Sequence, residues 1–148
     1  MASTDAVSEA QRSRRTNWNN QIARHAQMIP DRTALRFLGD SITWSTLDAR
    51  VEKLADALAR RGVSFGDRVL ILMLNRPEYL EVVLATNALG AIAVPVNFRL
   101  TPPEVAYLVN DSGSKVIVAE GPLAPLAGAA RAASEGIDIS IPVGAPAG

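Results

Sequence analysis

Apolar residues recur along the chain with two periods, and their alternation predicts buried strands and helices in turn. Three short runs are apolar at nearly every position, namely residues 68–74, 91–96 and 115–120, and a fourth strand is expected at 137–143. Such runs are typical of parallel strands covered on both faces, because a half-exposed strand alternates apolar and polar side chains. Helical spacing fills the segments between the runs. The pattern predicts a doubly wound α/β fold with a mostly parallel sheet and helices on both faces.

The first part of the chain shows a different pattern. A helix is predicted over residues 17–29, where an apolar stripe ends at Pro30. The stripe consists of Trp18, Ile22, Ala26 and Ile29. Residues 33–44 contain two short strand-like runs around Gly39-Asp40, which predicts a β-hairpin with its turn at that dipeptide.

Helix starts are marked by residues that can accept a hydrogen bond from a free backbone N–H group. Ser45, Asn75 and Thr101 are the predicted caps of three helices. Thr101 is followed three residues later by Glu104, the spacing of a capping box. Asp111, Ser112 and Gly113 are expected to end the helix that Thr101 opens. Gly62 is well placed just past the end of the helix that Ser45 opens, since glycine adopts the left-handed conformation of a helix end without strain.

Composition narrows the classes of function. The chain has 148 residues, of which 48% are hydrophobic, and its 15 Lys and Arg balance 15 Asp and Glu. A net charge of zero gives no electrostatic reason for nucleic-acid binding, and none is expected. The absence of cysteine excludes disulfides and thiolate metal sites, and a single histidine excludes a multi-histidine site. We expect no metal ligands and a cytoplasmic protein.

Three segments are expected along the chain. Residues 1–16 are predicted to form a flexible basic N-terminal tail, residues 17–143 the α/β lobe, and residues 144–148 a linker or the end of a truncated chain. No segment approaches the roughly 20 apolar residues that a membrane-spanning helix needs. The short run QRSRR at 11–15 leaves weak peripheral contact with a membrane open.

The loops after the strands hold little recognisable chemistry. None contains the glycine-rich turn of a dinucleotide-binding fold or of a P-loop. His25 has no acidic neighbour in sequence to orient it as a base, and Ser45 is better explained as a cap than as a nucleophile. Asp111 and Glu120 are most simply solvated charges at a helix end and a strand end. We therefore assign no catalytic residue.

Arg99 occupies a more informative position. It follows the carboxyl end of the second apolar run and precedes a helix N-terminus, and both places favour ligand binding in doubly wound sheets. A guanidinium group also suits phosphate because its donors form a rigid fork. An anion contact and an ordinary surface charge both stay open from the residues alone.

Residues 18–120 resemble the opening segment of adenylate-forming acyl-CoA synthetases, specifically bacterial fatty-acid–CoA ligases. The tracts GDRVLILMLNRPEYL and LGAIAVPVNFRLTPPEV carry the similarity. The resemblance implies the first lobe of the N-terminal domain of an enzyme that uses ATP, Mg²⁺ and CoA. Such an enzyme joins a carboxylate, here a fatty acid, to AMP and then to CoA. It also implies a contact between Arg99 and a phosphate of CoA, since the corresponding arginine can contact the nucleotide end of CoA in such enzymes.

The family's phosphate-binding, magnesium-binding and ribose-binding motifs do not occur in this sequence. The resemblance therefore implies an N-terminal fragment, inactive alone, whose partner is the remainder of the same polypeptide. Two alternatives stay open. One is a stand-alone, non-catalytic association module, and the other is an adenylating enzyme that loads an acceptor other than CoA. Formation of a homo-oligomer also stays open.

Overall fold

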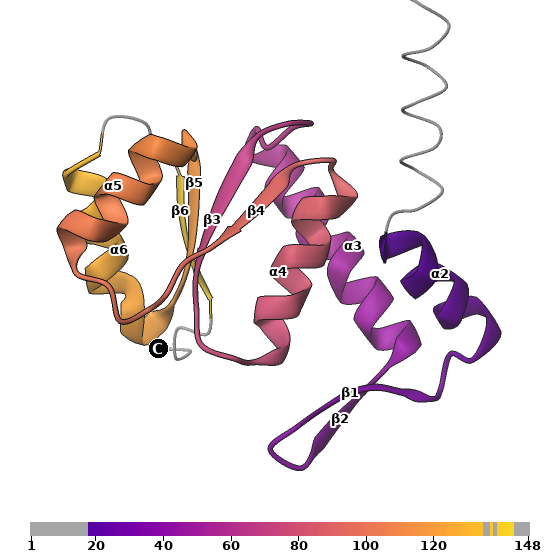
Figure 1. The fold of residues 1–148 in the computed structure, drawn as a ribbon. Coiled ribbons are helices and arrows are strands. Elements are labelled where there is room, and N and C mark those ends of the chain that lie inside the picture. Colours follow the sequence, from indigo (N-terminus) through magenta and orange to yellow (C-terminus); the bar gives the residue numbers. More distant parts are fainter. Residues whose placement is uncertain (1–17, 135–136, 138, 144–148) are drawn as a thin grey trace, which may run out of the picture.

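The computed structural model describes residues 18–134, 137 and 139–143 (Figure 1). Its helices are α2 (Trp18–Met28), α3 (Trp44–Arg60), α4 (Pro77–Ala88), α5 (Pro102–Ser112), the short 3₁₀ helix η1 (Gly121–Leu123) and α6 (Ala124–Ala132). Its strands are β1 (Thr33–Phe37), β2 (Asp40–Thr43), β3 (Arg68–Leu72), β4 (Ile92–Pro95), β5 (Val116–Glu120) and β6 (Ile139–Val143). The tail predicted over 1–16 and the end predicted over 144–148 lie outside the described residues.

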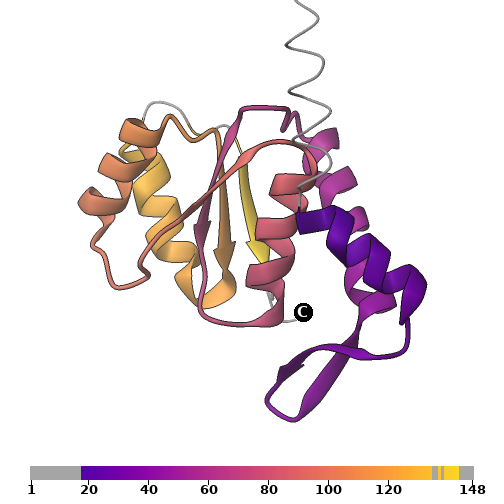
Figure 2. The same cartoon turned by 45° about the vertical axis from the view of Figure 1, so that its right-hand side comes forward.

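Four strands form a parallel sheet in the order β4-β3-β5-β6. The chain steps from β3 to β4 at one edge, then crosses back over β3 to form β5 and β6 on the other side. Because such crossovers are right-handed, the reversal moves the connecting helices to the opposite face. Figures 1 and 2 show α3 and α4 on one side of the sheet and α5 and α6 on the other. The predicted doubly wound fold is confirmed.

The central strands divide their side chains between two apolar cores. Val69 and Ile71 of β3 pack in the core beneath α3 and α4, whereas Leu70 and Leu72 pack in the core beneath α5 and α6. All four are fully buried. This two-sided burial explains why the run at 68–74 lacks polar alternation.

Strand β4 lies at an edge of the sheet, and this place explains its proline. Ile92 N donates to Asp67 O at 2.7 Å and Val96 N donates to Ile71 O at 3.0 Å, so these alternate residues face β3. Pro95 lies out of phase with them, and its nitrogen is turned away from β3. A proline is tolerated at such a position because no bond of the sheet is lost.

Two of the predicted helix caps are wrong. Helix α3 is capped by Thr43, whose Oγ1 accepts from Thr46 N at 3.2 Å, while the Ser45 hydroxyl donates to Pro30 O at 3.1 Å. Thr43 takes the cap because the last residue of β2 is already extended and leads directly into the helix. The N-cap of α4 is Arg76 instead of Asn75, and it makes no side-chain capping bond.

Both ends of α5 form as predicted. Glu104 Oε2 accepts from the backbone N and from the Oγ1 of Thr101, each at 2.7 Å. Gly113 ends the helix with φ +63°, in the left-handed region. Arg68 of β3 reaches this end, where its guanidinium donates to Ser112 O at 2.7 Å and to Gly113 O at 3.1 Å. A Cβ atom on Gly113 would lie 2.5 Å from Arg68 Nη2.

The N-terminal helix and the hairpin are attached to the side of this body. Of the predicted stripe on α2 only Ile22 is buried, and the Trp18 side chain is 74% exposed. The hairpin turn lies at Leu38 and Gly39, one residue earlier than predicted, because Phe37 pairs with Asp40. Within the described ranges, no helix combines the length and the hydropathy that crossing a membrane requires.

Candidate functional site

The carboxyl edge of the sheet is the first place to search for a site. In doubly wound sheets ligands bind beyond the carboxyl ends of the strands, at the point where the strand order reverses. Here that point lies between β3 and β5. The residues that follow these strands are Met73 to Arg76 on one side and Gly121 on the other, with Glu120 as the last residue of β5.

An ion pair between a buried glutamate and a half-buried arginine fills this point. Glu120 Oε1 accepts from Arg76 Nη1 at 2.8 Å, and Glu120 Oε2 accepts from the backbone N of Leu74 at 3.0 Å. Glu120 is 7% exposed, so the expectation of a solvated strand end is wrong. The carboxylate is satisfied on both oxygens, and it ties the end of β5 to the loop after β3.

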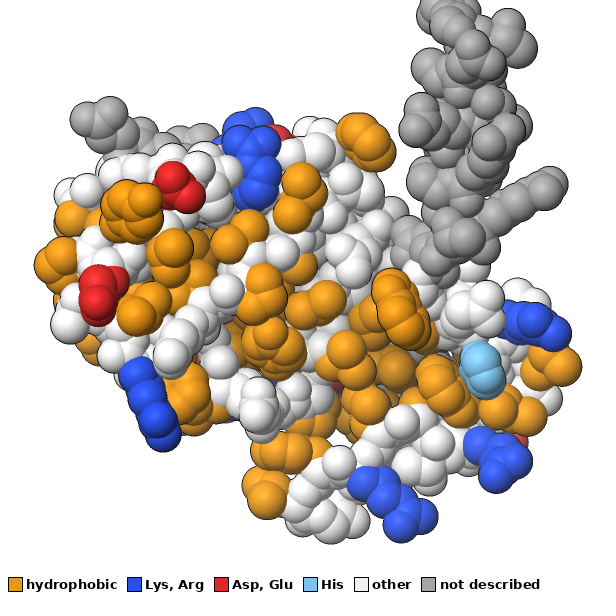
Figure 3. Space-filling model, viewed as in Figure 1, with side chains coloured by type: hydrophobic (Ala, Val, Ile, Leu, Met, Phe, Trp, Pro, Cys, Tyr) orange, Lys and Arg blue, Asp and Glu red, His pale blue; other side chains and the backbone are white. Residues whose placement is uncertain are grey.

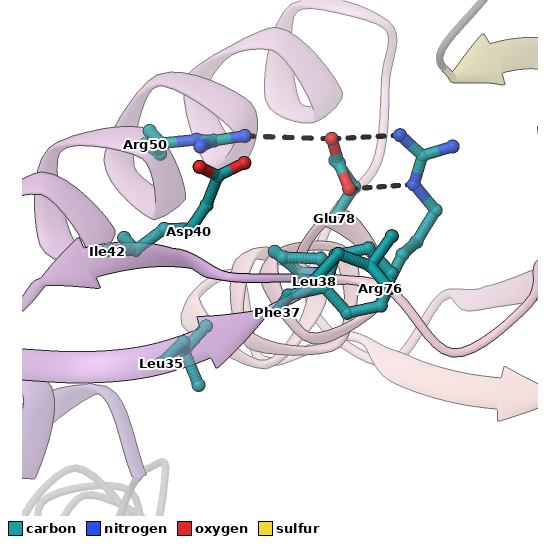
Figure 4. Close-up of a pocket in the computed structure, with 9 residues that line it drawn as sticks. Leu35, Phe37, Leu38, Asp40, Ile42, Arg50, Arg76 and Glu78 are labelled. Carbon is teal, nitrogen blue, oxygen red and sulfur yellow. Dashed lines mark hydrogen bonds and ion pairs between the residues drawn. The ribbon is translucent and has the colours of Figure 1, made fainter.

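The pair continues into a longer network. Arg76 Nε and Nη2 donate to the two oxygens of Glu78 at 2.7 and 3.1 Å, and Arg50 of α3 lies 3.9 Å from Glu78 (Figure 4). Arg50 also lies 3.0 Å from Glu81. The hydrogen bonds from Arg76 lower the pKa of Glu78, whereas burial raises the pKa of Glu81. Three carboxylates thus surround two guanidinium groups, and neither arginine offers an unshared charge to a phosphate.

A cavity of about 330 Å³ opens beside the network, under the hairpin. Its lining is Leu35, Phe37, Leu38, Asp40 and Ile42 from the hairpin with Arg50, Arg76, Pro77 and Glu78 from the body. The hairpin contributes mainly apolar side chains and the body mainly charged ones (Figure 4). In the part of the chain that the structure describes, no group of three or more His, Cys, Asp or Glu side chains could hold a metal ion.

Arg99 lies apart from this network in chain order, on the loop after β4. Its backbone N donates to Asn97 Oδ1 at 3.0 Å, and its guanidinium carbon lies 5.6 Å from the centre of the Phe98 ring. The side chain is exposed, and no described carboxylate lies within ion-pair distance of it. The neighbouring N-terminus of α5 already has a carboxylate, Glu104, which weakens the argument from the helix dipole.

His25, considered above as a base, and Lys115, at the start of the third apolar run, both have structural partners. The His25 ring stacks on Trp44 with 4.5 Å between ring centres, and its Nδ1 lies 2.6 Å from Gln21 O. Lys115, which follows the sequence DSGS, lies 2.8 Å from Asp67 Oδ1 and is not free to bind phosphate. Hydrogen bonds from Lys115 and from Ser64 lower the pKa of Asp67 to about 2.

A family model described as "AMP-binding enzyme" matches residues 22–143. The chain belongs to the AMP-binding enzyme family. It is 44% identical over 95 residues to a feruloyl-CoA synthase from an Amycolatopsis species, and 40% identical over 94 residues to the long-chain-fatty-acid–CoA ligase FadD13 from Mycobacterium tuberculosis. Each match covers 64% of this chain and 19% of the relative, so the chain spans about a fifth of their length.

A solved structure also resembles this AMP-binding chain, and it is the N-terminal domain of a relative. The N-terminal domain of FACL13 from M. tuberculosis superposes with a TM-score of 0.80 at 32% identity, over 86% of this chain and 34% of that domain. The predicted resemblance to the N-terminal portion of an acyl-CoA synthetase is confirmed.

Sequence reasoning missed the network of Arg50, Arg76, Glu78 and Glu120. The signal for it was weak, because only the adjacency of β3 and β5 brings Arg76 to Glu120, 44 residues later.

Proposed function

We propose that this lobe is part of an ATP-dependent ligase that converts a fatty acid to acyl-AMP and then to acyl-CoA. The observation that supports the proposal is the family match over residues 22–143, with a long-chain-fatty-acid–CoA ligase among the relatives. A feruloyl-CoA synthase is 44% identical against 40% for the fatty-acid ligase, so the fatty acid is the narrower part of the proposal.

ATP, Mg²⁺ and CoA are the cofactors of the proposed reaction, and we propose a contact of this lobe with only one of them, CoA. The reversal point of the sheet is filled by Arg76 and Glu120, and the described residues include no cluster of metal ligands. We therefore assign ATP and Mg²⁺ to the remainder of the enzyme and expect the lobe alone to be inactive. CoA supplies the thiol that displaces AMP.

Arg99 is the proposed contact of the lobe with CoA. Its guanidinium is exposed, has no described carboxylate partner, and lies on the loop at the carboxyl edge of the sheet. A rigid fork of N–H donors can bind a phosphate of CoA through two parallel bonds. Because CoA enters only the second step, this contact acts on thioester formation and not on adenylation.

A chimera tests the function directly. Residues 22–143 would replace the matching segment of FadD13, and pyrophosphate release and acyl-CoA formation would be measured with long-chain fatty acids and with ferulate. Restored acyl-CoA formation with fatty acids supports the proposal. Preference for ferulate contradicts its narrower part, and a folded but inactive chimera contradicts the whole proposal and favours an association module. Acyl-AMP formation without use of CoA indicates another acceptor.

The Arg99→Ala variant of the active chimera tests the proposed contact. We expect KM for CoA to rise about tenfold, the equivalent of roughly 1.4 kcal/mol, while pyrophosphate release in the first step is unchanged. Arg60→Ala is the matched control, since Arg60 is an exposed arginine at the end of α3. An unchanged KM for CoA would show that Arg99 is an ordinary surface charge. An equal loss of rate in both steps would indicate a folding defect.

The location and the remaining partners stay proposals. We propose a cytoplasmic enzyme whose basic N-terminal segment touches anionic membranes weakly. Cosedimentation with anionic vesicles at low and high salt tests this, because electrostatic binding falls as salt rises. Loss of binding on removal of residues 1–16 would support it, and equal binding by the shortened chain would contradict it. Formation of homo-oligomers is tested by the mass in solution.

A further inference from the structure

The loop between β4 and α5 is a tight turn with Phe98 and Arg99 at its two central positions. Leu100 N donates to Asn97 O at 3.2 Å and closes the turn, and the Asn97 side chain accepts a second bond from Arg99 N at 3.0 Å. Phe98 is 38% exposed, and Arg99 is exposed as well. In Figure 3, which has the view of Figure 1, a Lys or Arg side chain and hydrophobic side chains lie side by side at the lower left, where this loop runs. The turn therefore presents an aromatic ring and a guanidinium group to solvent together.

The Phe98 ring limits where the Arg99 guanidinium lies. The guanidinium carbon is 5.6 Å from the centre of the ring, within the distance at which an aromatic face attracts a cation. An arginine side chain has many rotamers, and fixing one of them when a ligand binds costs entropy. A ring that already holds the guanidinium lowers this cost, because part of the ordering takes place before the ligand arrives.

Glu104 is the acidic residue nearest to Arg99 along the chain, and another residue holds it. Its Oε2 accepts from the backbone N and the Oγ1 of Thr101, each at 2.7 Å, and these bonds lower the pKa of Glu104 below its usual value. A pair between this ionised carboxylate and Arg99 would leave less charge for a phosphate. The structure contains no such pair, since none of the described carboxylates lies within ion-pair distance of Arg99.

We propose that Phe98 and Thr101 are positioning residues for the contact between Arg99 and a phosphate of CoA. Phe98 holds the guanidinium in place, and Thr101 keeps the Glu104 carboxylate away from it. This inference rests on the proposed function, which supplies CoA as the ligand. The capping box then has two roles, because the bonds that start α5 also leave Arg99 unpaired. Both residues act through Arg99 on the binding of CoA, and neither acts on the reacting atoms.

Replacement of the ring tests the role of Phe98. In the FadD13 chimera, Phe98→Leu is expected to raise KM for CoA about threefold with kcat unchanged, whereas Phe98→Tyr keeps a ring and should preserve KM. Phe65→Leu is the matched control, since Phe65 is an exposed aromatic residue in the loop before β3. An unchanged KM in Phe98→Leu, or an equal rise in Phe65→Leu, would overturn the proposal.

A pair of variants tests the role of Thr101. Thr101→Ala is expected to raise KM for CoA about threefold, because Glu104 is then free to pair with Arg99. Adding Glu104→Gln should bring KM back to the native value, although it also removes the other half of the capping box. A weakened helix alone would make the double variant worse than Thr101→Ala, and that result overturns the proposal. Thr43→Ala, which removes the cap of α3, is the matched control and should leave KM unchanged.

A second thiol substrate shows whether these effects act through a phosphate. Pantetheine carries the thiol of CoA without any phosphate, so neither Phe98→Leu nor Thr101→Ala should change KM for pantetheine. Equal changes with CoA and with pantetheine would indicate a general defect and would overturn the proposal.

Direct binding separates this inference from the proposed function. If the chimera is folded but forms no acyl-CoA, the proposed activity is contradicted, and calorimetric titration with CoA then compares the same variants by Kd. Weaker binding in Phe98→Leu and Thr101→Ala than in their controls leaves the inference standing. If Arg99→Ala weakens the use or binding of CoA and these two variants do not, only this inference fails. If Arg99→Ala has no effect, the proposed contact and this inference both fail.

Discussion

The centre of the four-stranded sheet and the β1–β2 hairpin are both built from strands of four or five residues. Every residue of β5 is buried, whereas no residue of the hairpin is. In β5 the helices on both faces cover the side chains, and β3 and β6 cover both edges. The difference shows which part of the lobe is fully enclosed and which part only rests on it, through partly buried side chains such as Leu35.

The largest expected effect is the loss of stability when a side chain in the centre of the sheet is shortened, compared with the same change in the hairpin. Ile117→Ala in β5 removes a fully buried side chain that the core cannot refill, and we expect it to lower the free energy of unfolding by about 3 kcal/mol. Leu35→Ala in β1 is expected to lower it by less than about 1 kcal/mol, because Leu35 is only partly buried in the lobe. Unfolding by urea measures both. Equal losses would mean that the hairpin is part of the core.

The second effect tests the ion pair between the sheet and the loop after β3. Glu120→Ala leaves the N–H of Leu74 and one N–H of Arg76 without their acceptor, and we expect a loss of about 2 kcal/mol in unfolding free energy. Glu52→Ala, at an exposed carboxylate of α3, is the matched control and should change stability by less than about 0.5 kcal/mol. A loss no larger than that of the control would contradict the role of Glu120 in holding the loop.

The third effect has the opposite sign and belongs to the hairpin. Leu38→Asn places a residue that tolerates positive φ at the strained position, and we expect the isolated lobe to gain about 1 kcal/mol in unfolding free energy. Calorimetry measures the change. A loss of stability in the isolated lobe would show that Leu38 already packs within it.

The smallest effect is a pH dependence at the amino edge of the sheet. Hydrogen bonds lower the pKa of Asp67 from 3.8 to about 2, so its ionised form stabilises the folded state above about pH 4. That contribution is lost as pH falls from about 4 towards 2. Free energies of unfolding of the native chain and Asp67→Asn should therefore differ at pH 5 and converge near pH 2. A difference in unfolding free energy that does not change with pH would exclude titration of Asp67 as the cause of the difference.

Much of the fold was predictable because local sequence and tertiary structure agree in the body. The buried runs, the capping box at Thr101 and the helix end at Gly113 are all local signals, and each is confirmed. The cap of α3 was misplaced because Ser45 and Thr43 are both good caps, and only the extension of β2 to Thr43 decides between them.

The site was less predictable because it depends on strand order. Arg76 and Glu120 meet only since β3 and β5 are neighbours, and no local pattern near either residue shows this. Arg99 is the single site residue that the sequence predicts. It is exposed and has no carboxylate partner among the described residues, which leaves its guanidinium available to a ligand. Its role in binding CoA stays a prediction.

The contact between Arg68 and the end of α5 constrains how this sequence can evolve. Gly113 is held by its positive φ and also by the guanidinium of Arg68, which occupies the space that a side chain would need. A side chain at 113 would have to displace the Arg68 guanidinium from the carbonyls of Ser112 and Gly113, and it would also be strained by the positive φ. Gly113 is therefore expected to stay glycine among descendants of this chain, whichever residue stands at 68.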